Sequence, residues 1–258
     1  MPWPHQIERW RQFVLWECKD VYPDLVLAII KKESGGIPGL VAGASCKPWP
    51  IPLAGGGTIT YNHALGLMQI VPRTIASYNE RHPDEIVYYE DMKGQDERAA
   101  RLQIRVGCAV YASAVNALFR YDPRIFPAPS PGNATVEQLK LALVAYRMGF
   151  GALRKKLDKL RELGKPLTFE SLANTFPNWG MNEQGQWINR PIFYTSTLWD
   201  AAINHGMQPG EPTPPWTPGP TTPPGSPPPA IAGISNQTLG LLITVLVVSY
   251  KVWKSMKK

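Results

Sequence analysis

Glu33, a glutamate that closes an apolar stretch, has the sequence context of a general acid. Residues 24–32 repeat apolar side chains at helical spacing, which predicts a mostly buried helix that ends at Glu33. The helix macrodipole is negative at this end, and the last backbone carbonyls offer a carboxylate no hydrogen-bond donor. Both effects favour the neutral acid, which can donate a proton to a leaving oxygen. Gly35 and Gly36 follow after one serine and supply the backbone angles that end a helix sharply.

Three more short motifs follow Glu33-Ser34 along the chain. They are Gly66-Leu67-Met68-Gln69, then Ala145-Tyr146 with Gly149 beyond it, then a late tyrosine, Tyr194. A lone Glu-Ser pair equally fits a solvated helix end beside two lysines. The ordered series, which covers roughly residues 20–205, is more specific. It resembles the lysozyme-like lytic transglycosylases, relatives of goose-type lysozyme that cleave the glycan strands of bacterial peptidoglycan.

The resemblance implies a mechanism with one catalytic carboxyl group, Glu33. As an acid, Glu33 would protonate the oxygen between N-acetylmuramic acid and N-acetylglucosamine. As a base, it would then take the proton of the sugar's 6-hydroxyl, which closes onto the anomeric carbon and gives a 1,6-anhydro product. The resemblance also implies a set of substrate-binding residues: Ser34, Gly66, Leu67, Met68, Gln69, Tyr146, Arg147 and Tyr194.

The roles implied for these residues differ. Tyr146 is expected to orient Glu33 through its hydroxyl, and Met68 and Gln69 to line the sugar subsites. Ser34 would bond either to the backbone or to sugar. For each of these residues, packing in the core is the alternative.

Two departures from the family pattern affect the expected site. The third motif usually reads Ala-Tyr-Asn-x-Gly, whereas here the longer, charged Arg147 stands in place of the asparagine. The second departure is a long connection between the first two motifs, residues 41–63, which is rich in Gly and Pro and carries Trp49. This insert either forms part of a sugar-binding wall, because aromatic faces pack on pyranose rings, or is a tolerated insertion.

Three other functions stay open. A muramidase of the goose-lysozyme type would need a second carboxylate to position water, and the candidates follow the second motif: Asp84, Glu85, Glu90 and Asp91. An inactive wall-binding or virion structural module would explain the change at Arg147. A wall-remodelling enzyme associated with a secretion system would keep the chemistry and change its setting.

The fold expected for the globular part is mainly α, an α+β lysozyme-like fold with a cleft between lobes. Apolar periodicity predicts helices over residues 7–19, 23–32, 72–79, 97–119, 136–148, 153–163 and 192–204. Strands are hard to find, and a small hairpin around residues 58–61 is the only one predicted.

The chain divides into three parts by composition. Residues 1–208 form the enzyme-like domain, and residues 209–230 are a linker rich in Pro, Thr and Gly that cannot bury a core. Residues 231–258 contain an apolar run that no polar face interrupts, followed by a lysine-rich tail, which predicts a single transmembrane anchor. An amphipathic or buried helix is the alternative for this last part.

The first ten residues lack the basic patch and apolar run of a secretory signal. Delivery by a bacteriophage whose particle contains a membrane would give such an enzyme both lipid for its anchor and a route to the wall. The expected location is therefore the virion membrane, with virion proteins as further partners. The alternative is the bacterial inner membrane, with the catalytic domain facing the wall.

The three cysteines and four histidines show no spacing typical of a metal site or a redox motif. Cys18 and Cys108 lie in apolar helical runs and are expected as buried thiols, with a disulfide left open, and Cys46 has no close partner in sequence. The scattered histidines lack ligand spacing, so no metal or cofactor is expected. The net charge of +7 favours anionic wall polymers and lipid surfaces. No nucleic-acid-binding signature is present, so nucleic acid is not an expected partner.

Overall fold

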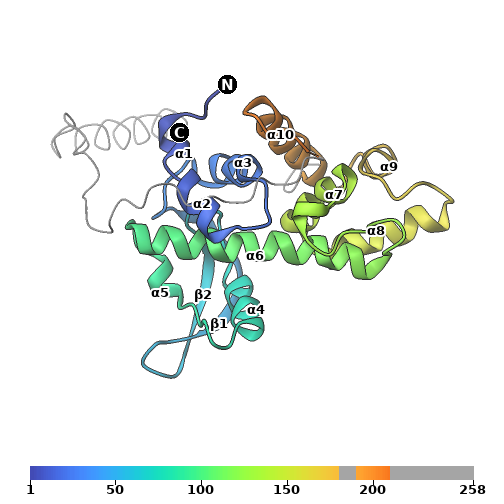
Figure 1. Cartoon of the computed structure of the whole chain (residues 1–258). Helices are drawn as coiled ribbons and strands as arrows, with labels where there is room; N and C mark the ends of the chain where they lie inside the picture. Colours follow the sequence, from blue (N-terminus) through green and yellow to red (C-terminus); the bar gives the residue numbers. More distant parts are fainter. Residues whose placement is uncertain (180–189, 210–258) are drawn as a thin grey trace, which may run out of the picture. The chain divides into compact units, whose positions relative to one another are not determined.

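The computed structural model describes residues 1–179 and 190–209 (Figure 1). The chain divides into two compact units, Met1–Trp216 and Thr217–Lys258. The linker and the membrane anchor predicted for residues 209–230 and 231–258 lie outside the described residues, apart from residue 209.

The described part is mostly helical with one small sheet, as expected for a lysozyme-like α+β domain. The elements in chain order are α1 (His5–Glu8), α2 (Arg11–Glu17), α3 (Pro23–Ser34), β1 (Val41–Pro52), β2 (Thr58–Leu65), α4 (Pro72–Arg81), α5 (Tyr89–Met92), α6 (Glu97–Tyr121), the 3₁₀ turn η1 (Pro131–Asn133), α7 (Val136–Met148), α8 (Phe150–Glu162), α9 (Phe169–Thr175) and α10 (Pro191–Asn204).

Six of the seven predicted helices are confirmed, with ends shifted by a few residues. The helix predicted over residues 7–19 is instead two short ones, α1 and α2. At the break between them, the side chains of Arg9 and Trp10 both donate hydrogen bonds to the carbonyl of Gly36, at 3.3 and 3.1 Å. The break therefore fixes the N-terminal segment over the end of α3.

The long helix α6 is the centre of the core. Asp96 caps it by accepting a hydrogen bond from the amide of Ala99 at 2.8 Å. It packs against α2, α4, α5 and α7, and Figure 1 shows it between α2 and α3 on one side and the β1–β2 hairpin with α4 on the other. A Cβ at Gly107, midway along α6, would lie 2.2 Å from the sulfur of Met68, so only glycine admits that side chain.

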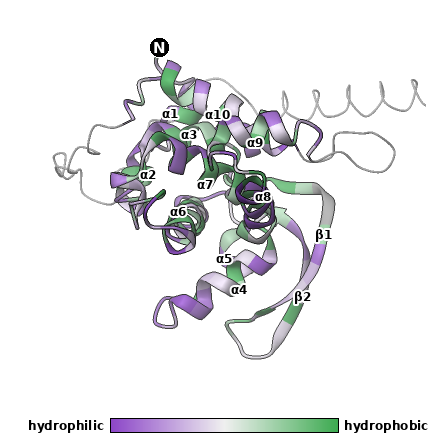
Figure 2. Ribbon diagram, turned by 90° about the vertical axis from the view of Figure 1, so that its right-hand side faces the viewer, coloured by the Kyte–Doolittle hydropathy of each residue, from purple (hydrophilic) through white to green (hydrophobic). Residues whose placement is uncertain are grey.

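The insert at residues 41–63 forms a larger hairpin than predicted. β1 and β2 pair antiparallel with two register shifts, and Figure 2 shows the hairpin projecting beside α4 and α5. Ile51 is fully buried, and Tyr61 stacks on Tyr89 with ring centroids 3.7 Å apart. The hairpin is therefore anchored to the helices by its own side chains.

Cys18 and Cys108 form a disulfide, so the expectation of two free buried thiols is wrong. The two cysteines are 90 residues apart in sequence, yet their Cα atoms are 5.6 Å apart because Cys18 ends α2 where it packs on the middle of α6. Beside the disulfide, the carboxylate of Glu17 accepts hydrogen bonds from Arg101 and Arg105 at 2.8 and 2.7 Å.

Within the described residues, one helix is long and apolar enough to cross a membrane, namely α6. Half of its most apolar stretch is buried inside the protein. Its apolar character is therefore explained by its central position in the core.

Candidate active site

The end of α3 places the Glu33 side chain at the wall of a cleft. Gly35 takes the left-handed conformation, with φ of 62°, and its amide closes the last turn onto the carbonyl of Lys31. Gly36 has φ of 88°, and a Cβ there would lie 2.5 Å from the carbonyl oxygen of Gln6. The two glycines thus end the helix at Ser34, one residue after Glu33, whose side chain is 11% exposed.

Ser34 lies beneath the site and ties α3 to the second motif. Its Oγ is 3.0 Å from the carbonyl oxygen of Ile30 and 2.9 Å from that of Leu67, and it accepts a hydrogen bond from the amide of Gly36. Because Ser34 is buried, its hydroxyl serves the backbone, and the prediction that it binds substrate is not supported.

The second motif is a tight turn held from below by Gln103 of α6. Gly66 has φ of 79°, and a Cβ there would lie 2.2 Å from the Gln103 side chain, so glycine is required. Gln103 accepts a hydrogen bond from the amide of Leu67 at 2.8 Å. Gln69 also has a positive φ, 47°, and its side-chain amide donates to the carbonyl of Gly66 at 3.0 Å. Gly66 and Leu67 shape this turn, while Met68 and Gln69 line the cleft.

The hydroxyl of Tyr146 bonds to the second-motif turn and not to Glu33. Its hydroxyl donates to the carbonyl of Met68 at 2.9 Å, so the expected contact from this hydroxyl to Glu33 is wrong. Burial, and then the nearby charge of Glu33, raise the pKa of Tyr146 far above its ordinary value. The tyrosine therefore stays a neutral hydrogen-bond donor.

Tyr194 of α10 is the tyrosine that contacts Glu33. Its hydroxyl donates to Oε1 of Glu33 at 2.5 Å. Burial, and then the charge of Glu33, raise the pKa of Tyr194 well above its ordinary value, so it too remains a donor. The contact joins residues 161 positions apart, and it exists because α10 packs against α3.

Arg147 approaches the same carboxyl oxygen. Its Nη1 lies 3.7 Å from Oε1 of Glu33, and its guanidinium lies 5.1 Å from the centre of the Tyr194 ring. The Arg147 guanidinium and the Tyr194 hydroxyl both stabilise negative charge on Oε1. Among the described residues, no hydrogen bond reaches the other carboxyl oxygen, Oε2, of Glu33.

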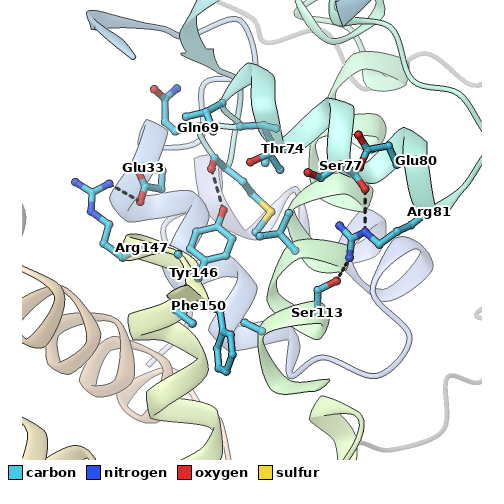
Figure 3. A pocket seen from close by; sticks show the side chains of 17 residues that line it. Glu33, Gln69, Thr74, Ser77, Glu80, Arg81, Ser113, Tyr146, Arg147 and Phe150 are labelled. Atoms are coloured by element: carbon cyan, nitrogen blue, oxygen red, sulfur yellow. Dashed lines mark hydrogen bonds and ion pairs between the residues drawn. The ribbon is translucent and has the colours of Figure 1, made fainter. Parts of the chain in front are cut away.

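The cleft beside Glu33 has a volume of about 670 Å³. Figure 3 shows Glu33 and Arg147 at one end, Tyr146 and Phe150 along one side, and Glu80 and Arg81 at the far end. The residues that line it come from α3, the second-motif turn, α4, α6, α7 and the start of α8.

The far wall of the cleft was missed by sequence reasoning. It is made by polar side chains of α4 and α6, namely Thr74, Ser77, Glu80, Arg81 and Ser113. The guanidinium of Arg81 donates to the hydroxyl of Ser113 and to the carbonyl of Ser77, which links the two helices. Polar residues at positions 74 and 77 of the helix predicted over residues 72–79, and at position 81 just beyond it, were the available signal.

Among the described residues, the second carboxyl group that lines the cleft is Glu80. None of the four acids proposed for a muramidase, at positions 84, 85, 90 and 91, lines the cleft. Figure 3 shows Thr74 and Ser77 between Glu80 and Glu33. Trp49 of the hairpin is not a lining residue either; Arg73 lies 5.0 Å from its ring.

No metal site is formed by the residues that the structure describes. Within them, no three His, Cys, Asp or Glu side chains are grouped to hold an ion.

Part of the chain matches a known protein family. Residues 16–102 match the transglycosylase SLT domain. The matched segment holds Glu33-Ser34 and the turn from Gly66 to Gln69, so the expected resemblance is supported over this part of the chain. It ends before Tyr146 and Tyr194.

Among solved structures, the chain is similar to an inactive mutant of the lytic transglycosylase Slt from Pseudomonas aeruginosa, with a TM-score of 0.43 and 20% sequence identity. The similarity covers 77% of this chain and only 25% of that one. No curated protein matches the chain.

Proposed function

We propose that this protein is a lytic transglycosylase that cleaves the bond between N-acetylmuramic acid and N-acetylglucosamine in peptidoglycan. The observation that carries the proposal is the asymmetric setting of Glu33. Tyr194 and Arg147 both act on Oε1, whereas no described residue donates to Oε2. Oε2 is therefore the oxygen suited to carry the transferred proton.

In the first step, Oε2–H of Glu33 protonates the glycosidic oxygen while the bond from this oxygen to the anomeric carbon breaks. The carboxylate that forms is stabilised at Oε1 by the Tyr194 hydroxyl and the Arg147 guanidinium, so the loss of the proton costs less free energy. The acetamido group of the substrate stabilises the cationic sugar.

In the second step, the Glu33 carboxylate takes the proton of the sugar's 6-hydroxyl. The 6-oxygen bonds to the anomeric carbon and closes the 1,6-anhydro ring. The proton lost in the first step is regained, and no water is consumed. The position of Glu80 supports this route over hydrolysis, since the second carboxyl group of the cleft lies at its far end.

Digestion of purified peptidoglycan followed by mass spectrometry tests the proposal. The wild-type protein should release anhydro-muropeptides. Glu33→Gln should lower the rate by roughly 10²–10⁴-fold, because the general acid and base is lost. Glu80→Gln is the matched control and should still give anhydro products. If the wild type produced reducing ends and Glu80→Gln did not, the result would support a muramidase. If the wild type released no muropeptides, the result would support a binding or structural module.

The cellular setting belongs to the same proposal. The Cys18–Cys108 disulfide supports action in an oxidising compartment outside the cytoplasm, where such bonds persist. We retain the membrane anchor over residues 231–258 and delivery by a membrane-containing phage as predictions. A role in the inner membrane or beside a secretion system is the alternative.

A further inference from the structure

The outer face of α8 and the turn that follows it is strongly basic. Residues 150–165 carry six basic and two acidic side chains, a net charge of +4 compared with +7 for the whole chain. Three leucines, at positions 153, 157 and 160, are buried against the core, so the charged side chains lie on the remaining faces of the helix. The α8 basic face consists of Arg154, Lys155, Lys156, Lys159, Arg161 and Lys165.

Nearby carboxylates neutralise this face only in part. Asp158 lies 3.7 Å from Arg154 and also accepts a hydrogen bond from Tyr121, and Glu162 pairs with Lys159 at 2.8 Å. Asp122 lies 3.0 Å from Arg161, yet it is shared with a further arginine, Arg124, at 3.4 Å.

Three lysines of the α8 basic face, at positions 155, 156 and 165, make no ion pair with an acidic side chain of the described residues; Lys165 donates to the hydroxyl of Thr175 at 3.1 Å. Lys155 is exposed and makes no ion pair there. Lys156 lies 4.4 Å from the ring of Phe176, an aromatic contact that leaves its charge uncompensated.

A second charged surface, around the disulfide, provides the contrast. The pocket there is lined by three acidic side chains, Glu17, Asp20 and Glu85, and by three basic ones, Lys19, Arg101 and Arg105. Its formal charges balance, so it has no net attraction for an anion. Residues 150–165 carry a net charge of +4, so the α8 basic face, unlike this pocket, attracts anions.

The α8 basic face begins at the cleft. Gly149 and Phe150, which cap and start α8, line the cleft together with Glu33. A ligand held on α8 is therefore contiguous with the polymer held in the cleft. If this polymer is peptidoglycan, neighbouring material carries the free carboxylates of its stem peptides at regular intervals.

We infer that the α8 basic face binds the carboxylates of peptidoglycan stem peptides on strands beside the one in the cleft. The choice of polymer rests on the proposed function. Single pairs between exposed lysines and carboxylates are weak. Several pairs on one polymer act together, because each contact made raises the local concentration for the next. The face would hold the enzyme on the wall and lengthen its stay between cleavage events.

A pelleting assay with purified sacculi tests this inference in the full-length chain kept in a mild non-ionic detergent. All variants carry Glu33→Gln, so that the wall is not digested. One double variant, Arg154→Gln with Lys155→Gln, removes two charges from the α8 basic face. Its matched control, Lys19→Gln with Arg98→Gln, removes two exposed charges from the loop after α2 and from α6. Glutamine keeps helix propensity close to that of the residues it replaces.

We expect the α8 variant to bind sacculi about tenfold more weakly, as the loss of two exposed pairs implies, and the control to bind within about twofold of the parent. Sacculi whose carboxylates have been converted to neutral amides with a carbodiimide and ethanolamine should bind the parent at least as weakly as untreated sacculi bind the α8 variant. Both variants should keep the parent's circular-dichroism spectrum.

Three results would overturn the inference. The first is an equal loss of sacculus binding in the two double variants, and the second is unchanged binding of the parent to amidated sacculi. The third is an α8 variant that binds anionic phospholipid vesicles more weakly than the parent but binds sacculi equally well. The last result would assign the face to a membrane. The proposed lytic function can fail separately from this inference. It would be refuted alone if the wild-type protein released no anhydro products while the α8 variant still bound sacculi more weakly than its control.

Discussion

At the scale of single residues, the Glu33 carboxyl group is held by two neighbours that sequence order does not bring together. Tyr194 donates to Oε1 at 2.5 Å, and Arg147 lies 3.7 Å from the same oxygen. Arg147 stands where the resembling family has an asparagine, and its contact with both Glu33 and Tyr194 gives the change a structural role. It therefore does not by itself indicate lost catalysis.

Removal of the Tyr194 hydroxyl should slow the reaction. Tyr194→Phe keeps the ring that faces Arg147 and deletes the hydrogen bond to Oε1. A hydrogen bond to a charged group contributes about 1.5–3 kcal/mol, so we expect a rate roughly 10- to 100-fold lower on purified peptidoglycan. Tyr61→Phe, on the hairpin, is the control and should keep the wild-type rate. Full activity of Tyr194→Phe would remove Tyr194 from the mechanism.

At the scale of elements, α2 is attached to α6 by a disulfide and by an ion-pair cluster. Both attachments lie on the side of α6 that carries Cys108, Arg101 and Arg105. Met68, by contrast, fills the space left by Gly107 of the same helix. Because Met68 packs against Gly107, a shift of α6 would displace the second-motif turn. The disulfide and the ion pairs between α2 and α6 restrict such a shift and so help to preserve the shape of the cleft.

The disulfide should stabilise the fold. It closes a loop across 90 residues, and loss of such a cross-link costs about 2–4 kcal/mol. We expect the double variant Cys18→Ala/Cys108→Ala to melt about 5–15 °C below the wild type by differential scanning calorimetry. Dithiothreitol should lower the melting temperature of the wild type and of Cys46→Ala, but not that of the double variant. An unchanged wild-type transition in dithiothreitol would contradict the bond.

The Glu17 cluster should make stability depend on pH. Burial alone would raise the pKa of Glu17, but hydrogen bonds from Arg105 and Arg101 outweigh it and lower the pKa below the ordinary 4.5. A lowered folded-state pKa contributes stability that is present above the unfolded value and is lost as the pH falls through the folded one.

Urea unfolding measures this contribution. At about pH 7, Glu17→Gln should be about 1–2 kcal/mol less stable than the wild type, because its two arginine partners are partly exposed. The difference should shrink as the pH falls below 4.5 and through the lowered pKa of Glu17, where the folded wild type gains the proton. The exposed Glu90→Gln serves as the control. A difference that stays constant over this range would show that packing, not charge, is responsible.

At the scale of the whole molecule, the described core closes within the first unit. The last buried side chain of the described residues is Met207, whose amide bonds to the carbonyl of Ala202. His205 stacks on Trp3 at 3.7 Å, which joins the two ends of the described domain. The core of the described residues therefore extends to Met207.

A chain that stops after Gln208 should accordingly keep the fold and lose the predicted linker and membrane anchor. We expect its melting temperature to stay within about 3 °C of that of the full chain, since the deletion removes no described core residue. In a detergent phase-separation assay, the full chain should enter the detergent phase and the shortened chain the aqueous phase. Equal partitioning of the two would count against a membrane anchor at residues 231–258.

Much of the local structure was predictable because it depends on short-range periodicity. The helix ending at Glu33, the glycine stop after it and the long apolar helix around Cys108 all follow from residues close in sequence. The hairpin was underestimated because β1 and the turn after it are rich in Pro and Gly, which are typical of loops. Its pairing also depends on side chains such as Ile51 that are buried in the core.

Residues close together in the chain were enough to identify the candidate acid, its place at a helix end and the order of the motifs around it. The packing of distant helices fixes which tyrosine reaches Glu33, which cysteines pair, and that α4 and α6 supply the far wall of the cleft. The physical reason is the range of the interactions. Helix propensity and capping act within a few residues, whereas these contacts join positions 90 and 161 residues apart and exist only once α2, α6, α3 and α10 have packed.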